Sequence, residues 1–88
     1  MLNPADETVI GALPVAGRDM LDVALGAAAD GLSLWRRTAP RDRATIMLRA
    51  AALLRVRVET IARSITLEHG KPLTEARLEV IRGAEFIE

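Results

Sequence analysis

The sequence contains no cysteine, and its only aromatic side chains are Trp35 and Phe86. Without cysteine the chain can form neither a disulfide nor a thiolate metal site, and it has no thiol nucleophile. A hydrophobic core must therefore be built from alanine, leucine, isoleucine and valine. Alanine favours helices but has little surface to bury, so helices of this composition form readily and pack with little apolar area.

Long hydrophobic runs are also absent. No apolar stretch approaches the roughly 18–20 residues that a membrane-spanning helix needs. The first residues lack the basic segment followed by an apolar one that marks a secretory signal peptide. These absences predict a cytoplasmic protein with no membrane association.

Charge of one sign is lacking as well, because twelve acidic and twelve basic residues cancel. The distribution is uneven: eight arginines lie between Arg36 and Arg63, against only Asp42 and Glu59. Half of the 88 residues are hydrophobic, which is ample for a core. A chain of this length buries only about 60–65% of its unfolded surface, so by itself it would be marginally stable.

Helical periodicity dominates what is present. A turn at 3–7 and a short β segment at 8–10 precede three predicted helices. The first begins near Arg18 or Asp19 and ends before Pro40, the second spans about 40–69 with a kink near Val56, and the third starts near Pro72. Their apolar stripes consist of Leu21, Ala24, Leu25, Ala28, Leu32 and Trp35; of Met47, Ala50, Leu54, Val58, Ile61 and Ile65; and of Ala76, Val80, Ala84 and Ile87.

Few residues are candidates for chemistry. His69, the only histidine, is interpreted as a helix-end residue rather than a general base or metal ligand, because helix C-termini favour positive charge. Glu68 and Glu75 are interpreted as helix electrostatics rather than as a catalytic carboxylate pair. Lys71 follows Gly70, but the other residues of a phosphate-binding loop are missing.

The arginine-rich helix is the best case for binding. Its side chains do not share one helical face, aromatic residues for base stacking are nearly absent, and the net charge is zero. We therefore expect no nucleic-acid partner. Trp35 is expected to pack at a helix end, and a structural role is also expected for Arg43. The arginines considered are Arg41, Arg43, Arg49, Arg55, Arg57 and Arg63.

The segment Leu67–Leu73, with sequence LEHGKPL, carries a further signal. Gly70 suits the left-handed position after a helix, and Pro72 suits the start of the next. Together with other segments in order, it resembles the N-terminal region of aldehyde dehydrogenases, in particular the succinate-semialdehyde dehydrogenase branch. The other matching segments are 3–5, 9–11, 21–28, 35–36, 43, 46–51, 75–76, 79–80 and 84–88.

The resemblance implies oxidation of an aldehyde to a carboxylic acid with NAD or NADP. A cysteine thiolate attacks the carbonyl, a glutamate activates water, and amides stabilise the oxyanion. In the family these groups and the cofactor segments lie downstream of the matching region. No catalytic, cofactor-binding or metal-binding residue is therefore assigned here. We expect that this chain alone binds no cofactor and is inactive.

The resemblance also implies a place in a larger fold. Residues 1–88 are expected to be the N-terminal part of the α/β cofactor domain, incomplete at the C-terminal end, because 85–88 carries no helix stop signal. The expected partner is the remainder of the dehydrogenase chain, and the complete enzyme is expected to be a homo-oligomer. Departures from the family pattern are Gly17, where a Ser or Thr cap is usual, and Gly26. The alternative is a small helical protein-interaction module.

Overall fold

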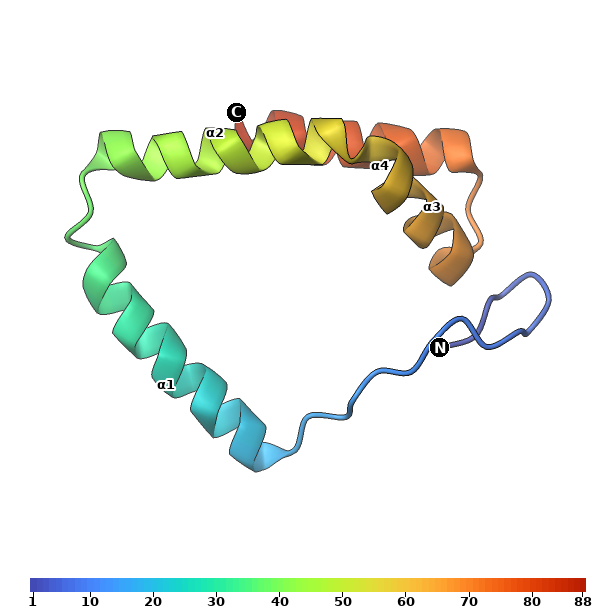
Figure 1. Cartoon of the computed structure of the whole chain (residues 1–88), viewed down its shortest axis with the longest axis horizontal. Coiled ribbons are helices and arrows are strands. Elements are labelled where there is room, and N and C mark those ends of the chain that lie inside the picture. Colours follow the sequence, from blue (N-terminus) through green and yellow to red (C-terminus); the bar gives the residue numbers. More distant parts are fainter.

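The computed structural model describes all 88 residues as four helices whose path curves round so that the N-terminal residues come near the corner between the last two helices (Figure 1). The helices are α1 (Arg18–Trp35), α2 (Pro40–Val56), α3 (Val58–His69) and α4 (Leu73–Ile87). The molecule measures 48 × 35 × 15 Å. Along the shortest dimension α2 lies in front of α4 and contacts it, whereas α1 lies apart from the other helices (Figure 1). The predicted mainly helical fold is confirmed.

The single helix predicted over residues 40–69 is two helices in the structure, α2 and α3. Residues 40–69 divide at Arg57, whose backbone (φ −101°, ψ 13°) leaves the helical region. The Arg57 N–H donates to the carbonyls of both Leu53 and Leu54, and its own carbonyl accepts from Ile61. The backbone hydrogen bonds thus continue while the direction changes, so that α3 leaves the line of α2 (Figure 1). The kink expected near Val56 is a break one residue later.

The corner between α3 and α4 has the backbone that its sequence predicts. Gly70 has φ +84°, and its N–H donates to the Thr66 carbonyl at 2.8 Å. Pro72 precedes α4, where its carbonyl accepts from Ala76 at 3.0 Å. Only glycine adopts the left-handed conformation without strain, and proline cannot continue a helix. Gly70 and Pro72 therefore end one helix and start the next, as expected.

The core lies between α2, α3 and α4 and is small. Only Ala51, Ala62, Ala76, Val80 and Ala84 are buried. Four of the five are alanines, so the helices approach closely but bury little apolar area. Partly buried side chains pack around Ala62, Ala76 and Val80; they are Leu54, Val58, Ile61, Ile65 and Leu73. The predicted stripes of α3 and α4 thus face each other.

Helix α1 stands apart. None of its residues is buried, although Leu21, Leu25 and Leu32 lie on the predicted apolar stripe and are 56–61% exposed. Its N-cap, Gly17, provides no side-chain hydrogen bond. The stripe predicted from the sequence exists as a surface, but nothing in the chain covers it. None of the four helices is long and apolar enough to cross a membrane.

The N-terminal arm, residues 1–11, contains no regular strand. The β segment expected at 8–10 is reduced to one antiparallel bridge between Leu2 and Val9. Asn3 donates its N–H to the Thr8 carbonyl at 2.8 Å, and Ile10 donates to the Met1 carbonyl at 3.0 Å. A pairing this short does not form a stable sheet, so the predicted β segment is not confirmed as a strand.

Candidate functional site

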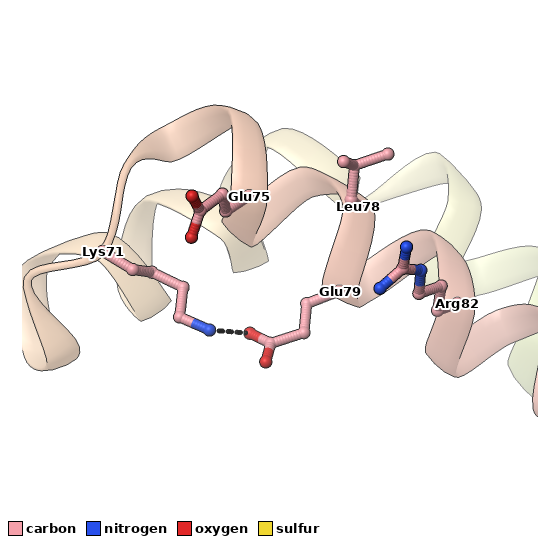
Figure 2. A pocket seen from close by; sticks show the side chains of 5 residues that line it. All are labelled: Lys71, Glu75, Leu78, Glu79 and Arg82. Carbon is pink, nitrogen blue, oxygen red and sulfur yellow. Dashed lines mark hydrogen bonds and ion pairs between the residues drawn. The ribbon is translucent and has the colours of Figure 1, made fainter.

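The most polar depression on the surface lies at the start of α4. Figure 2 shows its side chains: Lys71, Glu75, Leu78, Glu79 and Arg82. Lys71 and Glu79 point toward each other, with Nζ 2.8 Å from Oε2. The hydrogen bond from Lys71 holds the pKa of the Glu79 carboxyl below its ordinary value, and the positive charge of Lys71 adds to the effect. The pair links the α3–α4 corner to the second turn of α4.

This depression offers little chemistry. Of its two cationic side chains, Lys71 is paired with Glu79 and Arg82 is solvent-exposed, as are Glu75, Leu78 and Glu79. No set of three or more histidine, cysteine, aspartate or glutamate side chains lies close enough to hold a metal ion. An exposed ion pair of this kind orients a corner of the fold. It provides neither a general base in a dry environment nor a stabilised oxyanion position.

The residues that sequence analysis weighed for chemistry do not converge. His69 is the last residue of α3 and is exposed, and Glu68 lies beside it. Glu75 lies in the first turn of α4, where negative charge is favourable. Neither glutamate forms an ion pair with a neighbouring helix. These three residues thus lie at the ends of helices and do not form a common site.

The arginines divide into paired and unpaired groups. Arg77 donates from Nε and Nη2 to both carboxylate oxygens of Glu59, at 2.6 and 3.0 Å. Arg55 grips Glu88 in the same way, at 2.9 and 2.7 Å. These hydrogen bonds lower the pKa of both carboxyl groups. The pairs join α3 to α4 and α2 to the residue after α4. The arginines without an ion pair are Arg18, Arg36, Arg37, Arg41, Arg43, Arg49, Arg57, Arg63 and Arg82.

Trp35 and Arg43 lie near each other at the α1–α2 corner. The guanidinium carbon of Arg43 is 6.0 Å from the centre of the Trp35 ring, at the outer limit of a cation–π contact. Trp35 keeps 38% of its surface exposed. The contact connects α1 to α2 across the linker of residues 36–39.

The three ion pairs between separated residues were missed by sequence reasoning. Glu59 and Arg77 are 18 residues apart, and Arg55 and Glu88 are 33 apart. Helical spacing identifies partners only three or four residues away along one helix, so it does not reach these pairs. The partners come together only because α4 packs against both α2 and α3. No signal in a single sequence specifies this packing.

Comparison with known proteins identifies the family, which the local geometry does not. The sequence profile of the aldehyde dehydrogenase family matches residues 1–88. The chain is 41% identical over 86 residues to malonate-semialdehyde dehydrogenase 2 of Geobacillus kaustophilus, covering 98% of this chain and 18% of that protein. It is 40% identical over 86 residues, with the same coverage, to the NADP(+) succinate-semialdehyde dehydrogenase of Escherichia coli.

A third relative is more similar over a shorter stretch. The succinate-semialdehyde dehydrogenase of Paenarthrobacter nicotinovorans is 55% identical over 64 residues, which is 73% of this chain and 14% of that protein. The chain thus spans less than a fifth of the length of these curated relatives. The predicted family resemblance is confirmed. Both the profile match over the entire chain and the identities above 30% show that the chain belongs to the aldehyde dehydrogenase family.

Proposed function

We propose that residues 1–88 are the N-terminal helical part of an NAD(P)-dependent dehydrogenase that oxidises a semialdehyde to a carboxylic acid. One observation carries the proposal: the chain matches semialdehyde dehydrogenases along nearly its whole length while spanning 18% of theirs. In this proposal the cysteine nucleophile, the glutamate base and the cofactor segments belong to the remainder of the enzyme. Residues 1–88 contribute packing surface to the cofactor domain.

The exposed apolar residues support this assignment. Helix α1 buries no side chain, and Leu53 and Phe86 on the other helices are 53% and 91% exposed. Apolar surface of this extent favours contact with further protein. The remainder of the dehydrogenase would cover it, and the complete enzyme would be a cytoplasmic homo-oligomer. The arginines, in this proposal, bind no nucleic acid.

A chimera tests the proposal. Residues 1–88 replace the matching 86-residue region of the E. coli succinate-semialdehyde dehydrogenase, and NADPH formation from succinate semialdehyde is measured. We expect a soluble, active chimera, because 40% identity preserves the pattern of packing positions. The same enzyme with that region deleted is the control and is expected to be inactive. An insoluble or inactive chimera would contradict the proposal.

The chain alone is expected to show no dehydrogenase activity, because it contains no cysteine. The assay is NADH and NADPH formation with succinate semialdehyde and several simple aldehydes. Turnover above a protein-free control would show that the activity does not need a cysteine nucleophile and would overturn the assignment.

The second candidate is a small helical interaction module. The same exposed stripe of α1 favours it, because an amphipathic helix with no intramolecular partner suits a groove on another protein. The two candidates predict different activities for the chimera. An interaction module whose surface no longer packs against the rest of a dehydrogenase would give a chimera that forms no NADPH. Sequencing the adjacent DNA separates them independently, since only the first candidate requires the rest of a dehydrogenase to be encoded next to it.

A further inference from the structure

The N-terminal arm is a locally closed unit. Besides the backbone bonds at Asn3 and Ile10, the Met1 amino group donates to the Gly11 carbonyl at 2.7 Å. Asp6 accepts from both the N–H and the hydroxyl of Thr8, at 3.0 and 2.7 Å. These bonds tie the two sides of the arm together and present the turn at residues 4–6 at its tip.

The tip rests on the corner between α3 and α4. A Cβ on residue 70 would lie 2.9 Å from Cγ of Pro4 and 3.7 Å from its Cβ. The Pro4 ring therefore occupies the space that any other residue's side chain would need. Gly70 is required twice, by its φ of +84° and by this contact. The helical glycines Gly26 and Gly83 have nothing within 4 Å of the equivalent position.

This contact closes the ring that the chain forms in Figure 1. The arm reaches the α3–α4 corner, residues 12–17 lead from it to α1, and residues 36–39 lead from α1 to α2. Since α1 buries no residue, its position depends on these two connections rather than on packing of its own side chains.

We propose that the N-terminal arm acts as a strap. The contact of Pro4 with Gly70 restrains the N-terminal end of α1, and this restraint keeps the apolar stripe of α1 away from α2, α3 and α4. Releasing the strap leaves α1 attached only at the α1–α2 corner, through residues 36–39 and the Trp35–Arg43 contact, so that its orientation can vary. The strap is a property of this chain and does not depend on which dehydrogenase it serves.

Distance measurements between spin labels test the strap. The chain has no cysteine, so Asp22→Cys in α1 and Ser64→Cys in α3, both exposed, place labels only there. The labelled chain is mixed with an excess of unlabelled chain, so that distances between associated copies do not contribute. We expect a narrow distribution of distances within the otherwise unchanged chain. Gly70→Ala should broaden it about twofold and make amide exchange at Asn3 and Ile10 about tenfold faster, because local opening controls exchange.

A second variant separates the strap from damage to the corner. Pro4→Gly removes the ring but leaves Gly70 and both helices unaltered, and we expect the same broadening. Ala5→Gly controls for added flexibility in the arm, and Gly83→Ala controls for a glycine replacement without a neighbour; both should keep the narrow distribution. A distribution that is already broad in the unchanged chain, or one that Pro4→Gly leaves narrow, would overturn the proposal.

Discussion

At the scale of single residues, Thr66 has the one buried polar side-chain atom without a hydrogen-bond partner. Other hydroxyls on the helices return to the chain: Thr45 donates to the Arg41 carbonyl and Ser64 to the Thr60 carbonyl. The Thr66 carbonyl accepts from Gly70, but its hydroxyl is buried and makes no bond. A buried unsatisfied hydroxyl lowers stability, because it loses its hydrogen bonds to water.

Thr66→Val should therefore raise the free energy of unfolding. Valine has the same branched shape and removes only the hydroxyl, so we expect a gain of about 1 kcal/mol. The urea midpoint of the helical circular dichroism signal measures it. Thr60→Val, at an exposed position of the same helix, is the control and should change stability by less than about 0.5 kcal/mol. Equal effects at both positions would show that Thr66 is solvated.

At the scale of the elements, α2, α3 and α4 are held by close contact of small residues and by ion pairs at their edges. Ala51 is fully buried on α2, whereas its neighbour Ala52 is exposed. Sequence periodicity placed Met47 and Ala50 on the core stripe of α2. The structure leaves Met47 42% exposed and buries Ala51 instead, so the core-facing side of α2 is rotated from the predicted one. Leu54, which is also on the predicted stripe, does pack against the core, so the difference is small.

Ala51→Leu tests this assignment of the buried face. A larger side chain in a close helix contact forces the helices apart, and we expect a loss of about 1–3 kcal/mol in unfolding free energy. Ala52→Leu adds the same atoms one residue away on an exposed face and should change stability by less than about 0.5 kcal/mol. Thermal or urea unfolding followed by circular dichroism compares them. A greater loss of unfolding free energy with Ala52→Leu would show that the side of α2 carrying Ala52, rather than Ala51, faces the core.

The ion pairs predict a loss of stability in acid. Glu59, Glu79 and Glu88 each accept a hydrogen bond from a basic side chain, which lowers their pKa in the folded chain. A carboxyl with a lowered folded pKa contributes stability above its unfolded pKa, about 4.3, and loses it as pH falls through the folded value. We expect constant stability from pH 7 to about pH 5 and a decline below.

The pH dependence has a matched control. Replacing Glu59, Glu79 and Glu88 by glutamine should flatten the decline, because these positions then no longer titrate. Replacing Glu68, Glu75 and Glu85, which form no ion pair, removes the same charge and should leave most of the decline in place. Urea unfolding at several pH values measures both. Identical profiles for the two triple variants would assign the acid sensitivity to general charge repulsion.

At the scale of the whole molecule, apolar surface is exposed on every helix. The chain buries only five residues, and the molecule is only 15 Å thick along its shortest dimension. Val15, Val56 and Phe86 are 95%, 83% and 91% exposed. Exposed apolar surface of this extent promotes association between chains. In the proposed assignment, the remainder of the dehydrogenase covers this surface.

The isolated chain should self-associate. We expect its sedimentation coefficient to rise with protein concentration, while circular dichroism shows helix throughout. Leu25→Lys together with Leu32→Lys removes apolar surface from α1 without touching a buried residue, and should reduce association with little change in the stability of α2–α4. A monomer that unfolds in one sharp transition would instead indicate a self-sufficient module.

The sequence by itself determined the helical class, the corner at Gly70 and Pro72, the buried face of α4 and the family. These features depend on neighbouring residues or on an ordered set of local matches, so one sequence contains them. Tertiary structure decided the seating of Pro4 on Gly70 and the pairing of Arg77 with Glu59 and of Arg55 with Glu88. Each of these depends on the distance between residues far apart in the chain, and that distance is set only when the helices pack.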